Sequence, residues 1–182
     1  MSISEQLIDR KNRSLAILAA LCIIMAGLFI WLSRLLKKVK RLANTDGLTN
    51  ISNRRHGLKQ ARKLIIKNKH KRILGIAIFD LDHFKSVNDH YGHDIGDRVI
   101  QTAVDVIHAS LGKDAVFFRI GGEEFLLVTK GDSVNDIFTC LDGIRANIFD
   151  EDVTSLGLKA PIFASVGVTY MMPKDLGKTL TD

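Results

Sequence analysis

Four acidic side chains lie where buried strands are expected to end. Asp80 closes the apolar run of residues 73–80 (ILGIAIFD), and Asp82 follows two residues later. Glu123 and Glu124 come directly after two glycines. If the strands around these glycines pair beside the first strand, the four carboxylates meet at one edge of the sheet, where their mutual repulsion raises their pKa values.

A hard cation relieves such repulsion. Oxygen donors with few protein contacts favour magnesium, which keeps part of its water shell and recruits substrate phosphates. Gly121 and Gly122 lack a Cβ, so a phosphate chain can approach their backbone closely. The pattern predicts a metal-assisted nucleotide site that holds one or two ions. The alternative is that acids at strand ends are only solvated, and the charge pattern alone leaves both interpretations open.

Other chemistry-bearing residues give weaker signals. His90 and His93, with Asp89 and Asp94, are spaced like a transition-metal site on a loop, although polar loop groups are the simpler interpretation. The chain has only two cysteines, which excludes a disulfide framework and a four-cysteine zinc site. No P-loop, Rossmann or Gly-x-Ser-x-Gly pattern is present.

The elements that position these residues follow from hydrophobic periodicity. The continuous β-branched run at 73–80 is typical of a buried central strand, and Gly121-Gly122 between two short strands indicates a hairpin. The element order predicts a mixed α/β (α+β) sandwich with a hairpin inserted in the sheet. We expect helices at 53–70, 97–111 and 133–149, and strands at 73–80, 116–120, 125–129 and 162–170.

The periodicity also predicts which side chains of two helices face the core. In the helix at 53–70 these are Leu58, Ala61, Leu64 and Ile65. In the helix at 133–149, Cys140 is expected on or near the apolar side. No basic partner is spaced to activate this thiol, so a thiol nucleophile is not indicated.

Residues 14–33 (SLAILAALCIIMAGLFIWLS) carry no charge, and a helix of this length spans about 30 Å, the thickness of a bilayer core. Trp31 suits the membrane interface. A buried helix of a soluble core is disfavoured because the rest of the chain is too small to cover it. A cleaved signal peptide is disfavoured because the apolar stretch is too long and no Ala-x-Ala site precedes Arg34.

The charges around this segment predict its orientation. Five Lys/Arg follow it within residues 34–41 and three precede it within the tail 1–13, which places the C-terminal side in the cytoplasm. Residues 34–43 are expected to continue as an amphipathic helical stalk that can pair with a copy of itself. We therefore expect a single-pass protein of the cell membrane whose cytoplasmic domain, residues 44–182, folds separately.

The sequence pI of about 9.4 describes the flanks of the apolar segment, because residues 44–182 hold 18 basic and 18 acidic side chains. Nucleic acid is therefore not an expected partner. Within this domain, residues 54–72 carry nine Lys/Arg and no acid. A solvated helix face and attraction to anionic lipid or phosphates are both compatible with this pattern.

Four motifs occur in a characteristic order. They are DGLTNISNRR at 46–55, FDLDHFKSVNDHYGHDIGDRVI at 79–100, GGEEF at 121–125 preceded by FRI, and SVGVTY at 165–170. Together they resemble the GGDEF family of diguanylate cyclases, in its GGEEF form. The resemblance implies a palm-like nucleotidyl-cyclase fold. It also implies that a homodimer joins two GTP molecules, one bound by each subunit, into cyclic di-GMP and releases two pyrophosphates.

The resemblance also implies the cofactor and the residue roles. The cofactor would be magnesium, with manganese as an alternative, and catalysis would rest on positioning and charge neutralisation. Asp46 and Arg119 occupy positions that the resemblance associates with linking the entry helix and supporting the site. The remaining implied roles are metal binding by Asp80, Leu81 (through its carbonyl), Glu123 and Glu124, with the last two also catalytic; guanine recognition by Asn88 and Asp97; and phosphate contacts by Phe84, Lys85, Gly121 and Gly122.

Two features depart from the family pattern. The Arg-x-x-Asp product site of many members falls on Gly112 and Ala115, with Asp114 one place off, so we expect no product inhibition there. The sequence ends at Asp182, before the family's last helix and strand, so we expect one sheet face to expose Ile and Val side chains. Two alternative functions follow: a catalytically inactive GTP-binding or signalling module, and another nucleotide cyclase or polymerase-like enzyme with the same metal chemistry.

Overall fold

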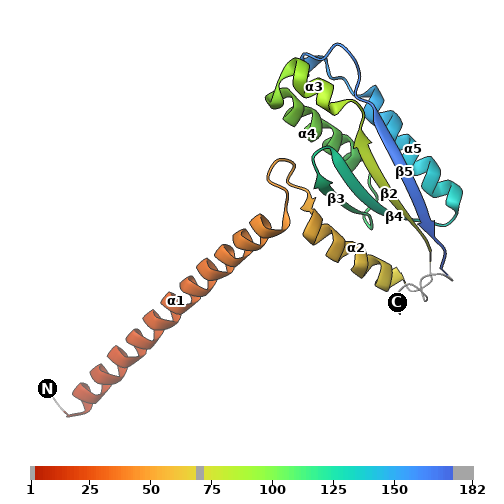
Figure 1. The fold of residues 1–182 in the computed structure, drawn as a ribbon. Helices are drawn as coiled ribbons and strands as arrows, with labels where there is room; N and C mark the ends of the chain where they lie inside the picture. Colours follow the sequence, from red (N-terminus) through yellow and green to blue (C-terminus); the bar gives the residue numbers. More distant parts are fainter. Residues whose placement is uncertain (1–2, 69–71, 174–182) are drawn as a thin grey trace. The chain divides into compact units, whose positions relative to one another are not determined.

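The computed structural model describes residues 3–68 and 72–173 of the 182-residue chain (Figure 1). The chain divides into two units, Met1–Ala43 and Asn44–Asp182. The first unit is built from α1 (Ile3–Asn44), a single helix of 42 residues. Residues 3–13 of the expected tail, the apolar segment and the stalk therefore lie on one continuous helix.

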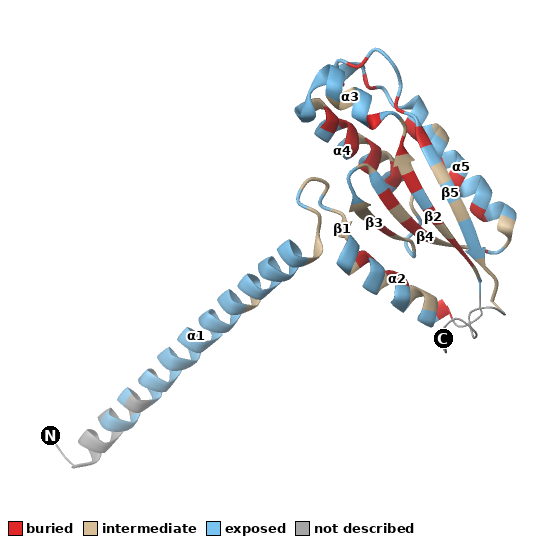
Figure 2. Cartoon of the chain, in the orientation of Figure 1, coloured by how far each residue is buried: buried red, intermediate tan, exposed pale blue. Residues whose placement is uncertain are grey.

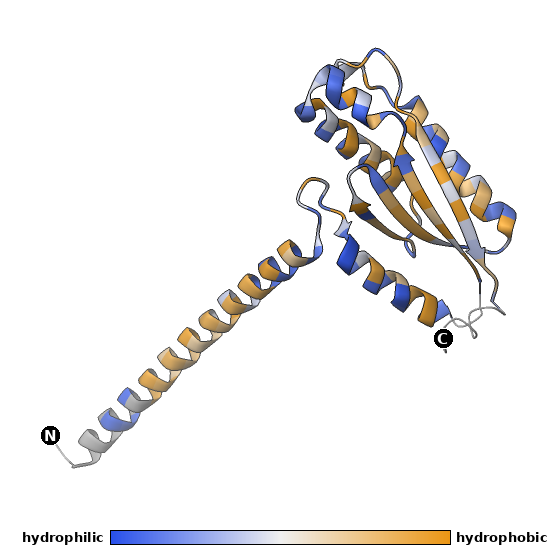
Figure 3. Cartoon of the chain, in the orientation of Figure 1, coloured by the Kyte–Doolittle hydropathy of each residue, from blue (hydrophilic) through white to orange (hydrophobic). Residues whose placement is uncertain are grey.

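Among the described residues, α1 is the one helix long and apolar enough to cross a membrane. Its candidate span is Ile17–Asn44, with a mean hydropathy of 2.2 in the most apolar stretch. The large apolar side chains of this span are exposed, and the hydropathy colouring shows a long orange band between polar ends (Figures 2 and 3). Signal sequences share this length and composition, so the finding concerns the helix and not its location.

The second unit is a mixed five-stranded sheet flanked by helices, which confirms the predicted fold class. The strand order is β1-β3-β4-β2-β5, and β2 lies antiparallel to both β4 and β5. The elements in chain order are β1 (Ser52–Asn53), α2 (Arg54–Asn68), β2 (Ile73–Leu81), α3 (Phe84–Tyr91), α4 (His93–Ala109), β3 (Val116–Gly121), β4 (Glu124–Gly131), α5 (Val134–Asp150), the 3₁₀ helix η1 (Thr154–Leu156) and β5 (Ala164–Met171).

The main core lies between the sheet and the helices α4 and α5. Alternate residues of β2, namely Ala77, Phe79 and Leu81, point to this side and are almost fully buried. Phe79 lies opposite Phe125 of β4, so the two aromatic rings anchor the pairing of the central strands. The helices contribute buried side chains at helical spacing, including Val99, Ile100, Ala103, Val104 and Ile107 from α4 and Ile137, Leu141, Ile144 and Ile148 from α5.

The opposite face of the sheet is covered by α2 over β3. The helix approaches closely because its inner residues, Gly57 and Ala61, are small, and a Cβ at Gly57 would overlap the Phe118 ring. Away from α2, Ile78 is 45% exposed. The expected exposure on this face is thus present at an isoleucine. Of the valines on this face, Val128 is buried beside Phe118 and Val116 is half-buried.

Several sequence expectations about the elements are wrong. Residues 84–91 form helix α3 rather than a loop, and α4 begins at His93 rather than at residue 97. Leu58 is 44% exposed, since α2 packs through its small residues instead. Cys140 is exposed. The last strand begins at Ala164, and the expected end of the first domain helix at residue 70 lies outside the described residues.

Candidate active site

Two carboxylates of the site lie directly opposite each other across the central strands. Asp80 near the end of β2 pairs in register with Glu124 at the start of β4. The β3–β4 turn puts Glu123 next to them. Burial raises the pKa of Asp80 above its ordinary value of 3.8, and the negative charges of Glu123, Glu124 and Asp82 raise it further. The predicted meeting of acids at one sheet edge is therefore present.

The turn that follows β3 has a backbone conformation that favours glycine. Gly122 has φ 53°, and both Gly121 and Gly122 are exposed. Arg119 fixes this turn: its Nε and Nη2 donate hydrogen bonds of 2.9 and 2.6 Å to the carbonyl oxygen of Gly122. The exposed backbone of the turn is thus held rigidly beside the carboxylates.

The same guanidinium ties the turn to the start of the domain. Arg119 Nη1 donates to Asp46 Oδ1 at 2.8 Å, and both side chains are largely buried. Asp46 Oδ1 also accepts from the Thr49 amide and hydroxyl at 3.0 and 2.8 Å. Burial alone raises the pKa of Asp46, but the hydrogen bonds from Arg119 and Thr49 outweigh it, so the pKa lies below 3.8.

The segment between β2 and α3 turns sharply beside the carboxylates. His83 has φ 57°, an uncommon value for a residue with a side chain, and this places Phe84 inside and Lys85 outside. Asp82 accepts a hydrogen bond of 2.7 Å from the Ser165 hydroxyl of β5. The side chain of Leu81 is buried, so it can face the site only through its backbone.

Helices α3 and α4 form a hairpin whose contact depends on Gly96. A Cβ at Gly96 would overlap Asn88 Oδ1 and would lie 3.2 Å from Phe84 Cζ. The missing side chain lets the Asn88 amide lie against α4, next to the exposed Asp97. The structure therefore places Phe84, Asn88 and Asp97 at one helix pair.

The groups available to a cation, namely the carboxylates of Asp80, Glu123 and Glu124 and the carbonyl of Leu81, are all oxygen donors, which suits magnesium. Within residues 3–68 and 72–173, no three His, Cys, Asp or Glu side chains come together as a ready metal cluster. Magnesium needs no such cluster, because one or two carboxylates suffice when phosphates and water complete the shell. The alternative site at His90 and His93 is not formed, since His90 lies on α3 and binds the Ser86 carbonyl through Nδ1 at 2.8 Å, and His93 begins α4.

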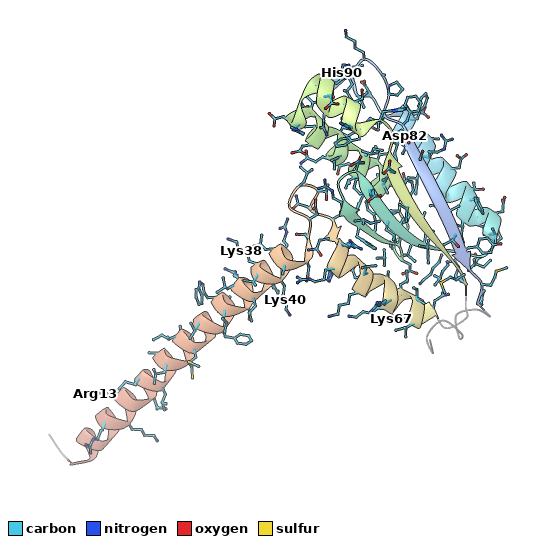
Figure 4. All side chains as sticks on the ribbon, in the orientation of Figure 1. Arg13, Lys38, Lys40, Lys67, Asp82 and His90 are labelled. Carbon is cyan, nitrogen blue, oxygen red and sulfur yellow. The ribbon has the colours of Figure 1, made fainter. Side chains whose placement is uncertain are left out.

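Sequence reasoning missed two residues of the site. Gly96 lies next to the amphipathic pattern of the expected helix, and a glycine within a helix often marks close packing against a neighbouring element, so this residue could have been identified. Ser165 is 83 residues from its partner Asp82, and a serine on a strand gives no such signal. The labelled Asp82 at the end of β2 can be followed in Figure 4.

Comparison with known proteins agrees with this geometry. Residues 43–181 match the family model described as diguanylate cyclase, GGDEF domain, so the chain belongs to that family. It is 36% identical over 147 residues to the probable diguanylate cyclase DgcT of Escherichia coli (strain K12), a match covering 81% of this chain and 31% of that protein. The probable diguanylate cyclase DgcC of the same strain is 32% identical over 143 residues, covering 76% and 37%. The chain thus spans about a third of the length of these curated relatives.

Solved structures share the fold. The coiled coil and GGDEF domain of DgcB from Caulobacter crescentus, in complex with c-di-GMP, aligns with a TM-score of 0.76 and 27% identity, covering 89% of this chain and 87% of that one. Diguanylate cyclase SiaD in complex with its activator SiaC from Pseudomonas aeruginosa aligns with a TM-score of 0.66 and 28% identity, covering 97% and 69%.

Proposed function

We propose that this chain is a membrane-anchored diguanylate cyclase that joins two GTP molecules into cyclic di-GMP and releases two pyrophosphates. The observation that carries the proposal is the in-register pair Asp80–Glu124 beside the rigid Gly121-Gly122 turn. Carboxylates for a cation and an exposed glycine backbone for phosphates lie side by side, in a chain of the family named for this reaction. The alternative function is a GTP-binding module without turnover. It would use the same site residues, so only the assay for product described below separates the two functions.

The residues hold the substrate for an in-line attack of the 3′-hydroxyl of one GTP on the α-phosphate of the other. When bound, magnesium neutralises phosphate charge; Asp80, Glu123, Glu124 and the Leu81 carbonyl would hold it. Because Gly121 and Gly122 have no Cβ, the phosphates can approach their backbone closely. Lys85, exposed at the start of α3, adds a positive charge.

Glu123 has the role closest to the chemistry. It lies between the glycine turn and the Asp80–Glu124 pair and accepts the proton of the attacking hydroxyl in this proposal. Asn88 and Asp97 bind the guanine edge, the first through its amide and the second through its carboxylate. Adenine offers a different donor and acceptor pattern at these positions, so a panel of nucleotides separates this enzyme from another nucleotide cyclase.

The proposal also assigns a location and an assembly. α1 crosses the membrane once, with the catalytic domain in the cytoplasm, as the five basic residues after the apolar segment favour over the three before it. Two chains bring their GTP molecules together, because each domain offers one glycine turn and one carboxylate pair.

The test uses the full chain in detergent micelles or membranes with GTP and magnesium. Cyclic di-GMP and pyrophosphate are followed by chromatography and mass spectrometry. We expect product that is lost in Glu123→Gln and retained in Asp105→Asn, a matched acid-to-amide change at an exposed position of α4. GTP binding without product from the folded wild-type chain would assign the chain to the inactive module instead.

A further inference from the structure

The outer face of α2 is cationic along its whole length. All six of its Lys and Arg side chains are exposed, and the helix contains no acid (Figure 2). Within the described residues, no ion pair involves Lys59, Lys63 or Lys67. The six residues are Arg54, Arg55, Lys59, Arg62, Lys63 and Lys67. A face that only needed solvation would gain from intrahelical acid–base pairs, which this helix does not have.

Two large apolar side chains lie exposed on the same helix. Ile66 is 51% exposed and Leu58 is 44% exposed, although α2 buries Gly57 and Ala61 against the sheet. Ile66 falls between Arg62 and Lys59 around the helix circumference, opposite the buried side. Cations combined with exposed apolar residues are typical of helices that lie at a membrane surface, whereas a site for soluble phosphate has no use for an exposed isoleucine.

The hollow on this face also suits phosphate groups. It has a volume of about 340 Å³ and is lined by Asn44, Arg55, His56, Lys59, Gln60 and Lys63. Gln60 Nε2 lies 2.8 Å from His56 Nε2, and Ser52 Oγ donates to Gln60 Oε1 at 3.4 Å. The lining is therefore held in place by hydrogen bonds below the lysine ammonium groups.

Charge is strongly separated within the domain. Residues 54–72 carry nine basic and no acidic side chains, whereas residues 73–182 carry nine basic and seventeen acidic ones. An anionic surface attracts the first part and repels the second, which gives the domain a preferred orientation. Residues 34–53, which include five Lys/Arg, separate α2 from the uncharged segment 14–33 of α1, so α2 follows the expected membrane segment closely in the chain.

We propose that the outer face of α2 docks on the anionic headgroups of the membrane that α1 crosses, with Ile66 reaching the headgroup region. This inference rests on the proposed membrane anchoring and is independent of turnover. Lys67 of α2 and Lys38 and Lys40 near the end of α1 are labelled in Figure 4.

The experiment places the full chain in nanodiscs of phosphatidylcholine alone or mixed with phosphatidylglycerol. A fluorophore is attached at position 66 in an Ile66→Cys variant that also carries Cys22→Ala and Cys140→Ser. The matched control carries Cys22→Ala and bears the fluorophore on the native Cys140, exposed on α5 across the sheet from α2. Lipids with a quencher near the headgroup report contact with the bilayer.

We expect quenching at position 66 in the anionic discs only, and none at Cys140 in either. Lys59→Gln with Lys63→Gln should reduce the docked-to-undocked ratio roughly 30-fold, since each cation contributes about fivefold at low salt. Raised salt should act in the same direction. Lys113→Gln with Lys159→Gln, an equal charge change at exposed positions outside α2, should leave quenching unchanged.

Three results would overturn the inference. Equal quenching in both lipids, no quenching from a chain that is present in the discs, or insensitivity to the Lys59 and Lys63 changes would each remove lipid docking by α2. Binding of inorganic phosphate at these lysines without lipid contact would assign the hollow to a soluble ligand. A chain that is absent from the discs altogether would remove the membrane anchoring as well, which distinguishes the two failures.

Discussion

Replacing Asp80 with asparagine should stabilise the metal-free protein while it removes activity. In the absence of a cation, the Asp80 carboxylate faces Glu124 across the strand pair, with Glu123 and Asp82 close by. No hydrogen bond within the described residues stabilises this carboxylate. Asp80→Asn keeps the shape of the side chain and removes one of the four charges, so repulsion falls and no contact is lost.

The size of the effect follows from the register. Like charges directly opposite on an antiparallel pair cost about 0.2–1 kcal/mol, and the site is open enough for water to screen them. We expect a gain of about 0.5–1 kcal/mol, which raises the melting temperature of a domain this size by about 2–4 °C. In the wild type, magnesium and GTP at ten times their dissociation constant should add about 1.4 kcal/mol, and this gain should be absent in the variant.

The assay is calorimetry of the full chain in detergent, first with EDTA and then with magnesium and GTP. Asp105→Asn, which removes an exposed charge on α4, is the matched control and should melt like the wild type in both conditions. The reasoning would be refuted if Asp80→Asn melted below the wild type in EDTA, or if it kept the full stabilisation by magnesium and GTP. Either result would mean that the Asp80 carboxylate makes favourable contacts in the metal-free protein, or that it is not the group through which magnesium and GTP stabilise the fold.

Three further predictions concern the supports of the site. Gly96→Ala displaces the Asn88 amide and should raise the KM for GTP at least tenfold in steady-state kinetics, with a smaller change in kcat. Gly122→Ala forces a side chain into φ 53° and should cost about 1–2 kcal/mol in denaturant unfolding, together with loss of activity. Asp46→Asn weakens the bond to Arg119 and should cost about 1–2 kcal/mol near pH 7. Because the pKa of Asp46 is depressed, this stability is present above pH 3.8 and is lost as the pH falls through the lower folded value, so acid unfolding of the variant should depend less on pH.

The central part of the fold could be predicted because its signals are local. The run at 73–79 is apolar throughout, which is typical of a central strand, although the face of this strand opposite the main core is only partly buried and Ile78 there is exposed. The glycine pair marked the hairpin, because positive φ is required there. The meeting of the acids at one sheet edge was expected from these two elements, provided that the hairpin pairs beside the first strand, whereas the register of Asp80 with Glu124 comes from the structure.

The missed features depend on contacts between distant residues. Leu58 was expected inside because it is apolar, but the choice of helix face was made by Gly57, which allows α2 to approach Phe118 closely. Helix α3 has eight residues and starts from the left-handed His83, so it gives too short a periodic signal. The two bonds from Arg119 to the Gly122 carbonyl stabilise the turn through a geometry that spacing does not encode.

The order in which the strands pair has a consequence for synthesis on the ribosome. β2 pairs on one edge with β4, which ends at Gly131, and on the other with β5, which ends at Met171. At about 5–20 residues per second, the 40 residues between these two points take roughly 2–8 s to translate. During this interval the β5-facing edge of β2 has no partner, although α1 has long since left the ribosome. If α1 enters a membrane as proposed, it does so while the sheet is incomplete, and the exposed edge of β2 is then a binding site for chaperones.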